Sequence, residues 1–143
     1  SFQAEDGIRD NIPSLVGSEM CIRDRLMAPA YAVSDMLKQA NLRLQDFDFY
    51  EIHEAFAAQT VATLKAWQSE EFCRDRLGRN EPMGPIDLSR LNVKGGSIAM
   101  GHPFAATGAR IMGTLAKVLG EKGSGRGLIS VCTAGGIGVS AIM

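Results

Sequence analysis

In the last third of the chain, a helix pattern is followed by two short apolar segments that are joined by a glycine turn. Apolar residues recur at three- and four-residue spacing over Ile111–Leu119, which predicts a helix that stops at Gly120. Leu128–Cys132 is an apolar run of strand length, Ala134–Gly136 forces a turn, and Ile137–Met143 returns as a second strand. This order predicts a helix packed on a sheet whose last two strands form a hairpin.

The preceding residues extend the alternation of helices and strands. The spacing of apolar residues predicts a helix from Met27 to Ala40, with Asn41 as its stop, and a buried strand over Phe47–Ile52. Glu54–Trp67 is apolar nearly all round and predicts a helix buried in the middle of the domain. The fold class is therefore α/β, with a mixed sheet covered by helices and an antiparallel last edge.

Composition narrows the classes of function. The 143 residues suit one domain, and a net charge of −1 without a basic stripe argues against a nucleic-acid partner. No apolar stretch has the length of a membrane span, and no leader pattern begins the chain. Cys21, Cys73 and Cys132 match neither a disulfide framework nor the paired spacing of a zinc site. A reducing compartment, the cytoplasm, is expected, with no metal.

His102 is the first candidate for chemistry. It lies between Gly101, which permits a tight backbone, and Pro103, which is expected to fix the start of the following helix. Imidazole groups titrate near neutrality, so a rigidly held one can take a proton from a thiol or hold a developing oxyanion. Taken alone, the pattern equally fits a loop histidine that only satisfies a backbone carbonyl.

Cys132 is the second candidate, at the end of a predicted strand and directly before the glycine turn. Backbone amides or a nearby imidazole could lower the pKa of a thiol there, although a buried cysteine is also common as an inert small hydrophobe. His53 and Glu54 follow the first strand and could position a water. On their own they equally describe a helix start with Glu54 in the first turn.

Three segments together resemble the C-terminal active-site blocks of the thiolase family. They are His53–Ala58 (HEAFAA), Gly95–Arg110 (GGSIAMGHPFAATGAR) and Cys132–Gly138 (CTAGGIG), and their order and separation also match. Most thiolases have asparagine at the first position of the first block, whereas histidine there resembles the β-subunit of the fatty-acid β-oxidation complex. The resemblance covers about residues 26–143 and implies the C-terminal domain of a thiolase-like layered fold.

The resemblance also implies roles for individual residues. His102 would activate a cysteine nucleophile and help hold the thioester oxygen, with His53 at the family position that orients a water in the same oxyanion hole. Cys132 would be the catalytic acid and base. The backbone amide of Ala134 would belong to a second oxyanion hole. Coenzyme A would be a substrate, and no covalently bound cofactor is implied.

Other features depart from the family pattern. The family's nucleophilic cysteine lies in the N-terminal half, and the surroundings of Cys21 do not resemble it. The loop domain that supplies most coenzyme A contacts in the family is also missing. Residues 1–25 resemble translated sequencing-adapter read-through, and the chain stops at Met143 inside the expected final strand. We therefore expect a non-native segment at 1–25, a truncated domain at 26–143, and no thiolysis by this chain alone.

Three functions remain open at this point. The first is a degradative 3-ketoacyl-CoA thiolase of fatty-acid β-oxidation, a long-chain enzyme by its resemblance to the β-subunit. The second is a biosynthetic acetyl-CoA acetyltransferase or a sterol-carrier-type thiolase, and the third is a non-catalytic thiolase-like subunit. The resemblance implies an acyl-CoA or coenzyme A ligand, a homo-oligomer, and a hydratase/dehydrogenase subunit as a further partner.

Overall fold

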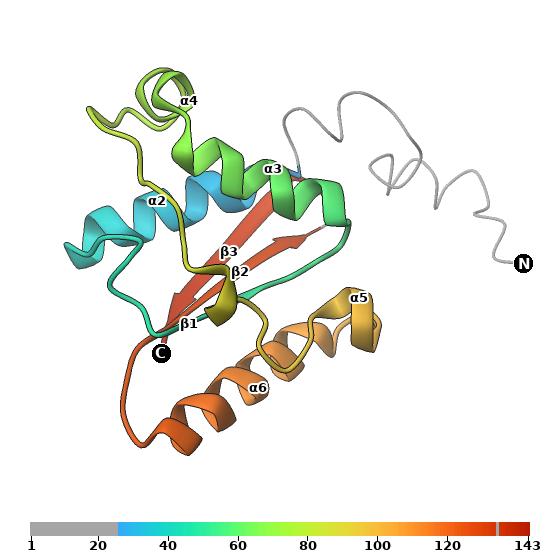
Figure 1. The fold of residues 1–143 in the computed structure, drawn as a ribbon. Helices are drawn as coiled ribbons and strands as arrows, with labels where there is room; N and C mark the ends of the chain where they lie inside the picture. The colour runs from blue at the N-terminus through green and yellow to red at the C-terminus, as the bar shows by residue number, and fades with distance from the viewer. Residues whose placement is uncertain (1–25, 134) are drawn as a thin grey trace, which may run out of the picture.

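The computed structural model describes residues 26–133 and 135–143. Within this part, a three-stranded sheet lies between two layers of helices (Figure 1). The prediction that residues 1–25 are non-native, and the role predicted for the amide of Ala134, concern residues outside the described part.

The sheet has the order β1-β2-β3 and is mixed. β1 (Phe49–Ile52) runs parallel to β2 (Gly127–Thr133), and β2 pairs antiparallel with β3 (Ile137–Ile142). The predicted hairpin and the antiparallel edge are confirmed, and the first strand lies within the predicted range. β2 is mostly apolar because both of its faces are covered: Leu128 packs in one core cluster and Ile129 in the other.

One face of the sheet is covered by the first two described helices. α2 (Ala28–Ala40) packs against β2 and β3, and α3 (Ala57–Gln68) packs against α2 (Figure 1). Asn41 ends α2 as predicted, in the left-handed conformation with a φ of 52°. The core on this face contains the following side chains, each at most 1% exposed: Val33, Leu37, Phe47, Trp67 and Leu128.

α6 (Thr107–Lys122) covers the opposite face, where Ile111 and Leu115 pack on Ile129. The predicted stop at Gly120 is wrong. The helix continues to Lys122, and Gly123 ends it with a φ of 91°. Gly120 keeps a helical backbone because the left-handed turn that a C-terminal glycine supplies is made three residues later.

The connection between the two layers carries three short helices. α4 follows α3 closely, and the other two lie in the segment that leads to α6. Their bounds are Glu70–Asp75 for α4, Leu88–Arg90 for the 3-10 helix η3, and Ser97–Met100 for α5.

α3 differs from its prediction in two ways. It begins at Ala57 rather than Glu54, and it is not buried all round. Its polar residues Gln59 and Thr63 face the interior, whereas Val61 is 50% exposed. Trp67 explains this orientation: it is fully buried in the core beside α2, and the polar residues one and two turns earlier lie on the same helix face.

Candidate active site

The candidate residues meet where the two parallel strands end. His53 directly follows β1, and Cys132 is the penultimate residue of β2. The backbone N–H of His53 donates to the carbonyl oxygen of Ser130 at 2.8 Å, which fixes the ends of the two strands at one edge of the sheet. Carboxyl ends of parallel strands are where α/β sheets present reactive groups, so this edge is the candidate site.

His53 is a buried imidazole with a defined partner. It is 2% exposed, and its Nδ1 lies 2.8 Å from the Oγ of Ser97 on α5. The same Oγ accepts a hydrogen bond from Nη2 of Arg110 at 2.8 Å. Burial, with the neighbouring His102 and Arg110, lowers the pKa of His53 to about 4, against a smaller opposite effect of Glu54. His53 is therefore neutral at neutral pH.

His102 faces His53 from the loop between α5 and α6. The two ring centroids are 4.4 Å apart, and Nδ1 of His102 lies 2.6 Å from the hydroxyl Oγ1 of Thr107. A φ of 89° at Gly101 turns the chain into this loop, as the glycine was expected to do. The hydrogen-bond partner of His102 is thus the side-chain hydroxyl of Thr107. This differs from the alternative in which His102 only hydrogen-bonds to a backbone carbonyl.

Pro103 does not start the helix that follows His102. α6 begins at Thr107, and the carbonyl oxygen of Pro103 accepts hydrogen bonds from the backbone N–H groups of Ala106 and Thr107, both at 3.1 Å. The delay has a local cause, because Ala105 adopts a φ of 65°, which no α-helix contains. His102 itself is exposed at the surface of the described chain.

Glu54 joins the segment after β1 to the segment that carries α5. Its carboxylate accepts from the side-chain amide of Asn92 at 2.8 Å and from the backbone N–H of Ile98 at 3.0 Å. The interpretation of Glu54 as a first-turn helix residue is wrong, because its contacts are made with α5 and not with α3. This carboxylate holds Ser97 in place beside His53.

Cys132 is buried and points toward α3. It is 6% exposed, and its Sγ lies 3.7 Å from Oε1 of Gln59, whose amide nitrogen in turn donates to Thr63. Burial raises the pKa of the Cys132 thiol, although its own backbone amide and that of Ala55 act in the opposite direction. Of the two possibilities left open by the sequence, a lowered thiol pKa is therefore not the one found, since the loss of solvent outweighs the amides.

The structure thus brings the two histidines into contact and places Cys132 near the end of the neighbouring strand β2. Within residues 26–133 and 135–143, no hydrogen bond joins Cys132 to either imidazole; its thiol interacts with Gln59 and with the backbone amide of Ala55. Ser97, Arg110 and Gln59 were not predicted as site residues. All three lie inside or next to the segments that resemble thiolases, but only the tertiary fold shows what they contact.

Two further charged groups lie beneath the site. Glu51 on β1 is 2% exposed, and burial raises its pKa to about 7 despite the opposing charge of Arg110. The guanidinium of Arg110 uses Nη2 for Ser97, while its buried Nε and Nη1 have no hydrogen-bond partner among the described residues. Arg110 therefore places a positive charge close to both Glu51 and His53.

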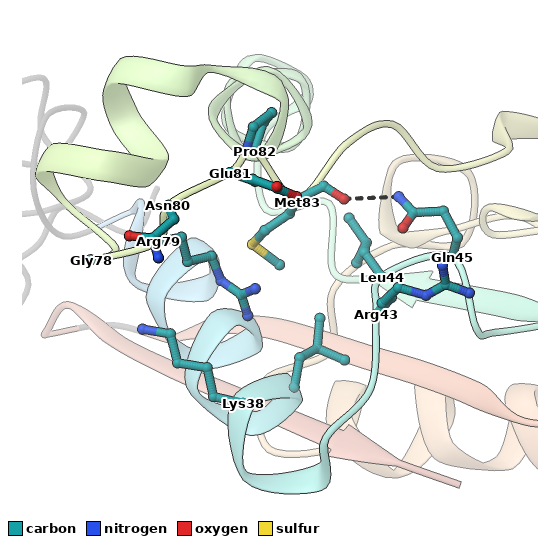
Figure 2. A pocket seen from close by; sticks show the side chains of 11 residues that line it. Lys38, Arg43, Leu44, Gln45, Gly78, Arg79, Asn80, Glu81, Pro82 and Met83 are labelled. Atoms are coloured by element: carbon teal, nitrogen blue, oxygen red, sulfur yellow. Dashed lines mark hydrogen bonds between the residues drawn. The ribbon is translucent and has the colours of Figure 1, made fainter.

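A hollow of about 600 Å³ lies elsewhere on the molecule (Figure 2). It lies between the end of α2 and the loop at residues 78–83, and a hydrogen bond of 2.9 Å from Nε2 of Gln45 to the carbonyl oxygen of Met83 crosses it. Its three cations are already engaged: Lys38 donates to the carbonyl oxygen of Leu77, Arg43 to the carboxylate of Asp46, and Arg79 to the hydroxyl of Ser34. His53, His102 and Cys132 do not line it.

Neither a metal-binding cluster nor a membrane-spanning helix is found among residues 26–133 and 135–143. In that part of the chain, no group of three or more His, Cys, Asp and Glu side chains is placed to hold a metal ion. None of the helices between residues 26 and 143 that the structure describes has the length and apolar character to cross a membrane.

Comparisons with known proteins all point to one family. The family model "Thiolase, C-terminal domain" matches residues 15–143. The 3-ketoacyl-CoA thiolase of a Shewanella species is 49% identical over 121 residues, which are 85% of this chain and 28% of that protein. The Shewanella baltica enzyme of the same name is 48% identical over 121 residues. The chain therefore spans a little over a quarter of the length of these relatives.

Solved structures agree with this result. The peroxisomal 3-ketoacyl-CoA thiolase of Saccharomyces cerevisiae, a five-layered α-β-α-β-α structure made from two core domains of identical topology, matches with a TM-score of 0.63 and 36% identity. The match covers 82% of this chain and 29% of that one. The acetyl-CoA acetyltransferase of Bacillus anthracis gives a TM-score of 0.65 and 35% identity over 82% and 26% of the two chains.

Proposed function

This chain belongs to the thiolase family, as its C-terminal domain, and from this premise we propose that it supplies the proton-transfer half of a thiolase active site. The whole enzyme would cleave a 3-ketoacyl-CoA with coenzyme A into acetyl-CoA and a shortened acyl-CoA. One observation carries the proposal: His53 and His102 are in ring contact, and His53 follows β1 at the end of the sheet where Cys132 is the penultimate residue of β2. The nucleophilic cysteine would come from the part of the enzyme that precedes this domain.

Hydrogen bonding equips His102 to act as a base. The hydroxyl of Thr107 donates its single proton to the carbonyl oxygen of Pro103 at 2.9 Å, so Oγ1 can only accept from Nδ1 of His102. The proton of the neutral ring is then on Nδ1, and Nε2 has a free lone pair. That nitrogen can take the proton of a cysteine thiol as the thiol attacks the ketone carbon.

Cys132 is equipped to act first as an acid. Its raised pKa keeps the thiol protonated at neutral pH, and Gln59 offers an acceptor for the S–H. When the carbon-carbon bond of the 3-ketoacyl group breaks, the electron pair remains on the α-carbon of the leaving acetyl-CoA, which takes the proton of Cys132. The resulting thiolate then removes the proton of the incoming coenzyme A thiol, which restores Cys132.

The degradative direction is supported by His53 and by the names of the Shewanella relatives, which are 3-ketoacyl-CoA thiolases. A second candidate is the condensation of acetyl groups, because two of the matching structures are acetyl-CoA acetyltransferases. In that reaction Cys132 would remove the α-proton of the second acyl group. The same proposal includes a role in fatty-acid β-oxidation and a location in the cytoplasm. It also includes assembly as a homo-oligomer, with a hydratase/dehydrogenase subunit as a further partner.

A hybrid enzyme tests this function. Residues 26–143 would replace the matching segment of a 3-ketoacyl-CoA thiolase relative, and cleavage of acetoacetyl-CoA and of a long-chain 3-ketoacyl-CoA would be measured with coenzyme A. We expect cleavage by the hybrid, a preference for the long chain, and none by the 143-residue chain alone. A preference for acetoacetyl-CoA would favour the acetyltransferase, and acyl transfer by the chain alone would contradict the proposal.

A further inference from the structure

The two histidines of the site are each bonded to a buried hydroxyl, and each hydroxyl has only one proton to give. For His102 the direction is settled, since the proton of Thr107 goes to a backbone carbonyl. For His53 the corresponding hydroxyl is that of Ser97, which is 6% exposed and therefore has little access to water. The direction of the hydrogen bond between them decides which nitrogen of His53 carries the proton.

Arg110 decides this direction. A guanidinium has donors and no acceptor, so Nη2 of Arg110 must donate to the Oγ of Ser97. Among the described residues, the only other hydrogen-bond partner of this hydroxyl is Nδ1 of His53, 2.8 Å away. If His53 also donated to Ser97, the serine proton would be buried without an acceptor, and leaving a buried donor unsatisfied is costly. Ser97 therefore donates to Nδ1, and the ring proton is on Nε2.

We propose that Arg110 and Ser97 are positioning residues that hold His53 as a neutral imidazole with its proton on Nε2, next to a His102 whose Nε2 is unprotonated. The two adjacent rings then have opposite tautomers: one presents an N–H donor and the other a lone pair. Neither Nε2 has a protein partner within the described residues, which leaves both for the substrate.

With these tautomers, the two histidines have different roles in the proposed reaction, one as a base and one as a hydrogen-bond donor. In that respect the inference rests on the proposed function. His102 accepts the thiol proton while the N–H of His53 donates to the oxygen that becomes negative, directly or through a water. Burial, and after it the proximity of His102 and the charge of Arg110, oppose a second proton on His53, in line with its pKa of about 4. His53 therefore stays a donor without becoming a cation.

The tautomers can be measured without any catalysis. The 143-residue chain contains only two histidines, so a sample labelled with nitrogen-15 in histidine gives two pairs of ring signals, assigned with a His102→Asn variant. Long-range proton-nitrogen correlation distinguishes a protonated from an unprotonated ring nitrogen. We expect the proton on Nε2 in His53 and on Nδ1 in His102. A His53 ring protonated on Nδ1 would overturn the inference.

Variants test the role of the two positioning residues. Ser97→Ala and Arg110→Met should each convert the single tautomer of His53 into a mixture, Ser97→Thr should restore it, and Ser124→Ala, at an exposed turn, should change nothing. An unchanged His53 signal in Ser97→Ala would refute the role of Ser97. In the hybrid enzyme, Ser97→Ala should lower kcat by about tenfold and leave KM nearly unchanged, since a transition-state donor is lost. An inactive hybrid with the expected tautomers would contradict the proposed function alone.

Discussion

Replacing Gly96 with alanine should disrupt the contact on which the geometry of the site depends. A Cβ at this position would overlap the carboxylate of Glu54 and would lie 2.7 Å from the side-chain nitrogen of Asn92. The carboxylate of Glu54 would have to move away from its present position, and its hydrogen bonds to Asn92 and to the backbone N–H of Ile98 would be lost. Hydrogen bonds to a charged group contribute about 1.5–3 kcal/mol each. Because Glu54 is only half-buried, we take the lower value for both and expect a loss of about 3 kcal/mol.

The assay is urea unfolding of the 143-residue chain, followed by the fluorescence of Trp67. This is the single tryptophan of the chain, and it is fully buried, so its emission reports the loss of the core. The control is Gly113→Ala in α6, where an added Cβ meets nothing within 4 Å. Alanine should stabilise that helix by about 0.5–1 kcal/mol. A Gly96→Ala variant that is as stable as the wild-type chain would refute the argument.

Two other substitutions test the described packing and charges. Glu51→Gln removes a carboxyl whose pKa is raised from 4.5 to about 7, so the wild-type chain loses stability as pH rises from 4.5 to 7 while the variant does not. The shift corresponds to about 3 kcal/mol, which we reduce to about 2 kcal/mol for partial solvent screening. The variant should therefore be more stable than the wild-type chain by about 2 kcal/mol at pH 8, whereas the carboxyl makes no difference at pH 4. A stability difference that does not change with pH would contradict this. Gly138→Ala places a Cβ against the backbone carbonyl of Ala28 at the start of α2, so it should cost at least about 2 kcal/mol in the same urea assay. Unchanged stability of Gly138→Ala would show that α2 does not pack on β3 as described.

Elements with a complete local signal were predictable from the sequence. α2 has apolar residues on one face and Asn41 at its end, and the hairpin has an apolar run, a glycine turn and a returning strand. The end of α6 was missed because Gly120 and Gly123 carry the same chemical signal. Only the geometry of the following turn selects the second glycine, which has the left-handed backbone.

Properties that depend on distant contacts could not be predicted. α3 is rich in apolar residues, but its rotation is fixed by Trp67, which packs beside α2 and turns Gln59 toward Cys132. The sequence left the direction of the Cys132 pKa open for the same reason, since burial is a tertiary property.

In the candidate site, too, the local motifs were predictable from the sequence and the tertiary contacts were not. The segments with His53, His102 and Cys132 were identified by their resemblance to thiolases. Ser97 and Arg110 are 13 positions apart, and their joint contact with His53 exists only because α5 and α6 meet beside the end of β1.

The central claim is that this chain contributes Cys132 as the proton-transfer group of a thiolase. The most direct test is the rate of 3-ketoacyl-CoA cleavage by the hybrid enzyme with and without Cys132→Ser, each variant first shown to be folded. We expect cleavage by the parent hybrid and a rate at least about 10²-fold lower for Cys132→Ser, since a positioned acid or base contributes about 10²–10⁴-fold. Equal rates for the two folded proteins would contradict it.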